Sequence, residues 1–155
     1  MASALTTKKF SAKNAVVSWD HDPGTTNALI TSPDGGTTKR YVALRDYEVF
    51  AGVVMATIAA TGPTLVEIVA AEDAAGTHET AIVSSGTVAA DAVGDGVFIE
   101  CTAAQVKEVG DAAGYTFTHV GIRITCGNSG DECCATYIRS ESKFEQSGLS
   151  ANFIS

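Results

Sequence analysis

The sequence contains no long hydrophobic run in its 155 residues. No stretch approaches the roughly 20 apolar residues that a membrane-spanning helix needs. The first 14 residues also lack the apolar segment of roughly 7–15 residues that a signal peptide requires. We therefore expect the chain to be made in a cytoplasm and to stay there. Thiols are kept reduced in that compartment, which argues against a disulfide framework built from the four cysteines.

Positive charge is also scarce. Ten Lys and Arg stand against 18 Asp and Glu, which gives a formal net charge of −8. Proteins bind nucleic acid through Lys and Arg on the phosphates, so we expect no nucleic-acid partner. The cationic exception is an N-terminal arm, residues 1–14, with Lys8, Lys9 and Lys13 and no acidic residue. This arm is either a frayed terminus or a segment that lies on an acidic partner surface.

Motifs typical of enzymes are missing as well. No Gly-x-Ser-x-Gly nucleophile elbow is present, and the glycine-rich segments lack the spacing and the Lys-Ser/Thr ending of a phosphate loop. Asp20, His21 and Asp22 are consecutive, but neighbours in an extended chain alternate sides, and the Pro-Gly that follows is typical of a turn. His78 and His119 have no evident partner. We expect no catalytic, cofactor or metal site, with an enzyme that uses cleft carboxylates as a lesser alternative.

Strand signals, in contrast, are abundant. Short apolar and β-branched segments alternate with clusters of turn residues, and we predict strands within residues 14–19, 27–32, 38–44, 47–62, 63–73, 78–86, 94–101, 115–126 and 133–140. In the segment 63–73, Val66, Ile68 and Ala70 form the better core face, and Gly52 is a candidate β-bulge. The pattern predicts one all-β domain over residues 1–155, a jelly-roll-like sandwich with extended termini.

One segment, near residues 102–110, has the signature of a short helix. Thr102 is a candidate N-cap, and Gln105 stands three positions later, which is the capping-box spacing. Gly110 or Gly114 can end the helix in the left-handed conformation. A helix of two to three turns is not stable alone, so we expect it to pack on the sheet.

Three of the four cysteines lie within residues 126–134. We predict a hairpin in which residues 127–132 form a polar loop and Cys126 lies nearly opposite Cys133 across the ladder. The spacing does not match a zinc site, and no helix start is present to activate a redox pair. A cross-strand disulfide between Cys126 and Cys133 is geometrically conceivable. The favoured interpretation is that these thiols, with Cys101 and Cys134, are small apolar side chains.

Residues 45–110 resemble the capsid decoration, or cement, proteins of tailed bacteriophage heads. The resemblance lies in alanine- and threonine-rich strands, the stretch ADAVGDGVFIE at 90–100 and the short helix that begins TAAQ at 102–105. Residues 121–140 continue it with one more strand pair, so it covers about two thirds of the chain. The four cysteines depart from the pattern of these proteins, which usually have few.

The resemblance implies a non-enzymatic virion protein on the capsid exterior. Such proteins bind the major capsid protein, bridge neighbouring capsomers and form homo-oligomers, with a trimer slightly favoured here. The candidate capsid contacts come from the arm and from the C-terminal tail, about residues 140–155, and are Lys8, Lys9, Phe10, Lys13, Phe144, Leu149 and Phe153. A carbohydrate- or receptor-binding virion module is the alternative, although one Trp and four Tyr supply few aromatic platforms.

Overall fold

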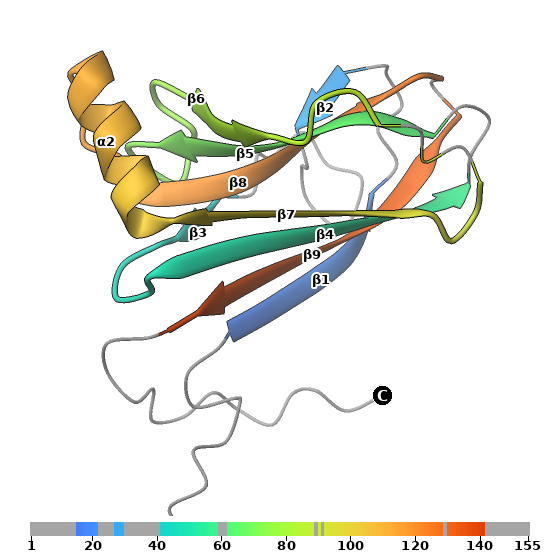
Figure 1. Cartoon of the computed structure of the whole chain (residues 1–155), viewed down its shortest axis with the longest axis horizontal. Coiled ribbons are helices and arrows are strands. Elements are labelled where there is room, and N and C mark those ends of the chain that lie inside the picture. Colours follow the sequence, from blue (N-terminus) through green and yellow to red (C-terminus); the bar gives the residue numbers. More distant parts are fainter. Residues whose placement is uncertain are drawn as a thin grey trace, which may run out of the picture.

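In the computed structural model the chain forms a sandwich of two antiparallel sheets (Figure 1). The structure describes residues 15–21, 27–29, 41–58, 62–88, 90, 92–128 and 130–141. The lower sheet of Figure 1 contains, in spatial order, β1 (Ala15–His21), β9 (Glu132–Ser140), β4 (Val49–Ile58) and β7 (Gly96–Thr102). The upper sheet contains β2 (Asn27–Leu29), β8 (His119–Cys126), β5 (Pro63–Ala71) and β6 (Thr80–Ser84), with β3 (Val42–Ala43) beside β8.

The strand pairing is nested. If the two-residue β3 is left aside, β1 pairs with β9, β2 with β8, β4 with β7 and β5 with β6, all antiparallel. The first strand thus meets the last and the innermost two form a hairpin, which is the topology of a jelly roll. The predicted all-β sandwich is confirmed.

The predicted hairpin of the last two strands is wrong. β8 lies in the upper sheet between β2 and β5, whereas β9 lies in the lower sheet between β1 and β4. The polar residues after Cys126 therefore cross from one sheet to the other. A short polar loop has the same composition whether its strands pair side by side or stack face to face, so the sequence did not distinguish the two arrangements.

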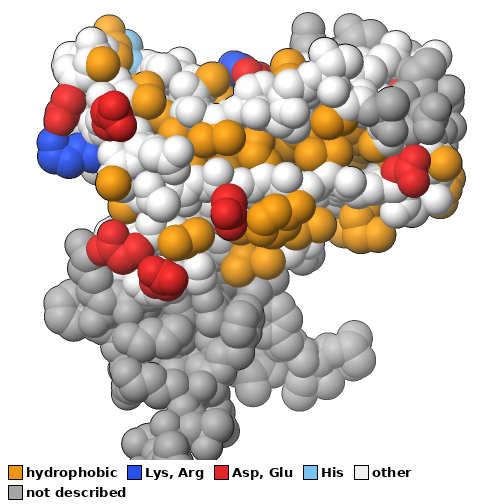
Figure 2. All heavy atoms as spheres, in the orientation of Figure 1, with side chains coloured by type: hydrophobic (Ala, Val, Ile, Leu, Met, Phe, Trp, Pro, Cys, Tyr) orange, Lys and Arg blue, Asp and Glu red, His pale blue; other side chains and the backbone are white. Residues whose placement is uncertain are grey.

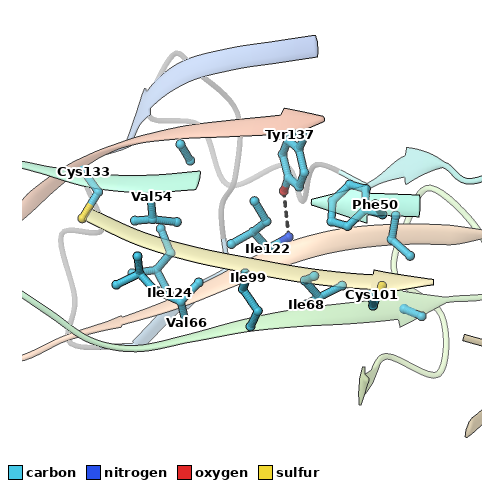
Figure 3. Packing of buried hydrophobic residues seen from close by; sticks show 14 of the residues in the cluster. Phe50, Val54, Val66, Ile68, Ile99, Cys101, Ile122, Ile124, Cys133 and Tyr137 are labelled. Atoms are coloured by element: carbon cyan, nitrogen blue, oxygen red, sulfur yellow. Dashed lines mark hydrogen bonds between the residues drawn. The ribbon is translucent and has the colours of Figure 1, made fainter. Parts of the chain in front are cut away.

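The core fills the space between the sheets (Figure 3). Alternate residues of β8 and β5 point inward, and the predicted core face of β5, Val66, Ile68 and Ala70, is fully buried. Gly52 is not a bulge, because the irregularity in β4 lies between Ala56 and Ile58. A Cβ at Gly52 would come within 2.5 Å of Ile122 Cδ1. Glycine at this position allows the two sheets to approach each other.

The helix α2 (Ala103–Ala113) stands at one end of the sandwich (Figure 1). The predicted start is confirmed, because Thr102 is the N-cap of a complete capping box with Gln105. Gly114, with φ 79°, ends the helix, which extends three residues beyond the expected 110. Val106 and Gly110 face the sheets and are buried. No helix among the described residues is long and apolar enough to cross a membrane.

The cap gives a first testable prediction. Gln105 N donates to Thr102 Oγ1 at 3.2 Å, and Thr102 N donates to Gln105 Oε1 at 2.9 Å. Thr102→Ala removes the side-chain acceptor and should lower the free energy of unfolding by about 0.5–2 kcal/mol, measured by urea denaturation. Thr102→Ser keeps the hydroxyl and should retain most of the stability. Equal midpoints for the alanine variant and the wild type would contradict this role.

Candidate interaction surface

The contact candidates predicted from the sequence, Lys8, Lys9, Phe10, Lys13, Phe144, Leu149 and Phe153, lie outside the described residues. Of the consecutive polar residues near the end of β1, Asp20 and His21 pair in register with Cys134 and Cys133 of β9, and Asp22 is not described. Within the described part of the chain, no three His, Cys, Asp or Glu residues are grouped so that they could hold a metal ion.

The β4–β7 end of the lower sheet carries exposed apolar side chains, which we call the β4–β7 patch and define as Met55 of β4, Val93 in the turn before β7 and Phe98 of β7. These side chains are 45%, 70% and 60% exposed. The patch arises from the alternation of β7, in which Val97 and Ile99 point inward while Phe98 points to solvent. Figure 2 shows hydrophobic side chains gathered along β7 and below it.

Strand register brings the members of the patch together. Phe98 lies opposite Val53, and Met55 lies opposite Gly96. The two pairs are two residues apart along the strands, so Phe98 and Met55 are on the same face of the sheet. The turn before β7 is fastened to the end of β4, because Gly94 N donates to the Ala56 carbonyl at 2.8 Å. Neither β4 nor β7 contains Lys or Arg. Phe98 lies on the edge strand β7, Met55 lies on its neighbour β4, and the exposed Glu100 of β7 is on the same face as Phe98.

The outer face of the upper sheet differs, because an ionic network covers part of it. Arg123 of β8 donates from Nε to Glu67 at 2.7 Å and from Nη1 to Glu79 at 2.8 Å. Tyr41 also donates to Glu79. The hydrogen bond with Glu67 is the largest cause of the raised pKa of Arg123. Both carboxylates are held by one guanidinium, so they are not a free acid–base pair for hydrolysis.

A third feature is an open groove of about 790 Å³ beside α2. It is lined by apolar and charged side chains, among them Leu44, Val106, Phe117, Arg45 and Lys107. Lys107 forms an ion pair with Asp111 one turn further along the helix. This pair offsets the charge of Lys107 but not that of Arg45, which also lines the groove.

Thr118 and His119 border the groove and resemble a hydroxyl–imidazole pair, with Thr118 Oγ1 and His119 Nδ1 2.8 Å apart. The single hydroxyl proton of Thr118, however, is donated to the Glu72 carbonyl. His119 must then donate to Thr118 rather than accept its proton. Burial lowers the pKa of His119, which favours the neutral ring. This arrangement does not activate a nucleophile.

His78 and Tyr115 form a stacked pair near the same end of the sandwich. Their ring centroids are 4.1 Å apart with an interplanar angle of 10°. His78 Nδ1 also lies 2.6 Å from Glu72 Oε2. The backbone of His78 is left-handed, with φ 52°. One face of Tyr115 is therefore covered, which leaves less of its ring free for stacking on a sugar.

The β4–β7 patch was missed by sequence reasoning. The alternation in residues 96–102 places Phe98 and Glu100 on the face opposite Val97 and Ile99, so an exposed Phe98 could have been found from that signal. Met55 lies in a long apolar segment without such alternation, and its exposure depends on which face of β4 meets the second sheet.

Comparisons with known proteins give two distant structural likenesses. No protein-family model and no curated protein sequence matches the chain. A structure described as Bacillus endospore appendages that form a novel family of disulfide-linked pili is 20% identical, with a TM-score of 0.39 over 83% of this chain and 88% of that one. Particles derived from Infectious Bursal Virus give 9% identity and a TM-score of 0.35, over 87% of this chain and 35% of that one. These likenesses do not define a family or a function.

Proposed function

We propose that this chain is a non-enzymatic structural subunit that binds the exterior of a phage capsid and stabilises it by bridging neighbouring capsomers. The observation that supports this most is the β4–β7 patch, an exposed apolar surface bordered by Glu100 in a chain with a net charge of −8. Exposed apolar patches with polar surroundings commonly mark protein–protein contacts. A partner that covers Met55 and Phe98 removes apolar surface from water, which favours association.

Three further features support a structural role over catalysis. The carboxylates of the upper sheet are tied to Arg123, and the hydroxyl of Thr118 is tied to a carbonyl. Residues 45–110 resemble phage decoration proteins in sequence style. A small contact of this kind gains strength by repetition, because many copies on a symmetric lattice bind together. We include self-association, with a trimer preferred, in the proposal, and the major capsid protein as the partner.

The proposal is tested by adding the purified protein to undecorated particles of its own phage. We expect ordered density on the outer surface by electron cryomicroscopy and a higher temperature of particle disruption. Bovine serum albumin at the same concentration serves as the control for non-specific protection. Absence of bound density at saturating protein, or density within the tail, would refute the proposal.

A carbohydrate- or receptor-binding role has less support. It needs an exposed aromatic platform, and among the described residues Tyr115 has one face covered by His78. Phe98 is exposed, but the apolar Val53 lies opposite it and Met55 lies nearby on the same strand pair, which suits a protein surface better than a sugar with many hydroxyl groups.

A further inference from the structure

Two thiols face each other across the sandwich rather than along a strand pair. Cys126 is the last residue of β8 in the upper sheet, and Cys133 lies near the start of β9 in the lower sheet. Their Sγ atoms are 3.9 Å apart, and both side chains are buried. Figure 3 shows Cys133 at one end of the core, with Cys101 at the other. A bond between these sulfurs would join the two sheets.

The loop between the two cysteines is fastened by its own hydrogen bonds. Asn128 N donates to the carboxylate of Asp131 at 2.9 Å, and Asp131 N donates to the Asn128 carbonyl at 3.2 Å. Gly127 N donates to the Gly62 carbonyl at 3.0 Å, which ties the loop to the segment before β5. These bonds hold the ends of β8 and β9 together, so the thiols are kept near each other in the folded chain.

The two thiols are not chemically equivalent. The hydrogen bond from Cys133 lowers the pKa of Cys126, although burial and the nearby charge of Asp131 oppose this effect. The same hydrogen bond, with burial, raises the pKa of Cys133. Cys126 is therefore the sulfur that ionises first and reacts first, and Cys133 is the sulfur that resolves the product.

The geometry points to a reversible disulfide between Cys126 and Cys133 that clamps the upper sheet to the lower sheet when the protein meets a peroxide. The sulfurs need to approach by about 2 Å to reach the bonding distance of about 2.05 Å. Side-chain rotation is the smallest movement that can supply this approach. The inference does not depend on the proposed function, because it concerns the fold alone.

The oxidation proceeds in two balanced steps. The Cys126 thiolate attacks one oxygen of hydrogen peroxide and breaks the O–O bond, which gives a sulfenic acid and a hydroxide that takes up a proton to become water. The Cys133 sulfur then attacks the Cys126 sulfur, forms the S–S bond, and expels the second water with the proton that Cys133 loses. Two thiols and one peroxide thus become one disulfide and two waters.

The other two cysteines do not compete within one chain. Cys101 is buried at the far end of the core (Figure 3). Cys134 follows Cys133 directly but points to the outer face of β9, away from the core in which Cys126 lies. Since adjacent strand residues project to opposite sides, Cys134 is poorly placed to reach Cys126.

The test is to reduce the full chain, remove the reductant and treat the protein with hydrogen peroxide. We expect a loss of about 2 Da in intact mass and a rise in melting temperature of roughly 5 °C or more, both reversed by dithiothreitol. Trypsin leaves Cys126, Cys133 and Cys134 on one peptide between Arg123 and Arg139. Glu-C, which cleaves after Glu132, separates Cys126 from the other two, so a linked pair of fragments shows that Cys126 is bonded to Cys133 or Cys134.

Matched variants identify the partner of Cys126. Cys134→Ser should keep both the mass loss and the stabilisation, whereas Cys126→Ala and Cys133→Ala should lose both. Because either alanine variant could fold poorly, the fragment mapping of the wild type and of Cys134→Ser decides the matter without them. The inference is overturned if Cys126 remains a free thiol after the treatment, or if its disulfide links two chains.

Discussion

Replacing Tyr137 with alanine is expected to lower the free energy of unfolding by at least about 4 kcal/mol, a large share of the roughly 5–15 kcal/mol that stabilises a typical domain. Tyr137 of β9 is buried and packs on Phe50, with ring centroids 5.2 Å apart. Its hydroxyl accepts a hydrogen bond from Ile122 N of β8 at 2.8 Å. The variant therefore leaves both a cavity and a buried backbone N–H without its acceptor.

The position of Ile122 explains why the hydroxyl is needed. β5 pairs with one side of β8, and β2 and β3 pair with the other. On the side of β2 and β3, β2 covers residues 123–125 and β3 covers residues 119–120, so Ile122 has no strand partner there among the described residues. Tyr137 supplies the acceptor from the other sheet, as the dashed line in Figure 3 shows.

Two further variants, measured by guanidinium chloride titration, separate the effect of the cavity from the effect of the lost hydrogen-bond acceptor. Tyr137→Phe keeps the ring but removes the acceptor and should cost about 1–3 kcal/mol. Ile138→Ala, on the outer face of the same strand, should cost less than Tyr137→Ala. A Tyr137→Phe variant as stable as the wild type would show that another group, such as water, satisfies Ile122.

Replacing Phe98 with aspartate is expected to weaken attachment to the capsid without unfolding the protein. Burial of a Phe side chain contributes about 1.5–3 kcal/mol, so its loss lowers the affinity of each contact by about 10- to 100-fold. Since Phe98 is 60% exposed and points away from the core, the melting temperature should change little. The measurement is the occupancy of undecorated particles across a concentration series.

Ala81→Asp is the matched control, because Ala81 is exposed on β6 in the other sheet and the variant adds the same charge. It should bind as the wild type does if the patch, and not the net charge, drives attachment. Equal losses for the two variants would assign the effect to charge repulsion instead. Equal binding of Phe98→Asp and wild type would remove the β4–β7 patch from the proposed interface.

Local patterns predicted the elements well because their causes are local. The capping box needs only Thr102 and Gln105, and the inward face of β5 follows from alternation in one segment. The stacking of β8 above β9 depends instead on which distant strands each one pairs with. That choice is made by β1, β4 and β5, and the loop at residues 127–131 carries no signal of it.

The positions of the thiols and the burial of the second face of β5 also depend on contacts between distant segments. Cys126 and Cys133 were correctly expected to lie near each other, but across the core rather than along a ladder. Val69 and Ala71, on the face of β5 that was expected to be the poorer core candidate, are also buried. Tyr41 is buried in the same cluster, a contact between segments more than 25 residues apart that no local window contains.

The nested pairing also bears on how the chain is made. β9 lies between β1 and β4 in the lower sheet, so β1 has no neighbour in that sheet until residues 132–140 have been synthesised. While the ribosome is still making the chain, the β5–β6 hairpin and the β4–β7 pair around it can form, but the first strand must wait for the last. Folding that depends on such distant partners is slow, and β1 stays exposed to other unfinished chains meanwhile. Emergence of β9 from the ribosome, rather than of the first strands, thus sets the earliest moment at which the lower sheet can be completed.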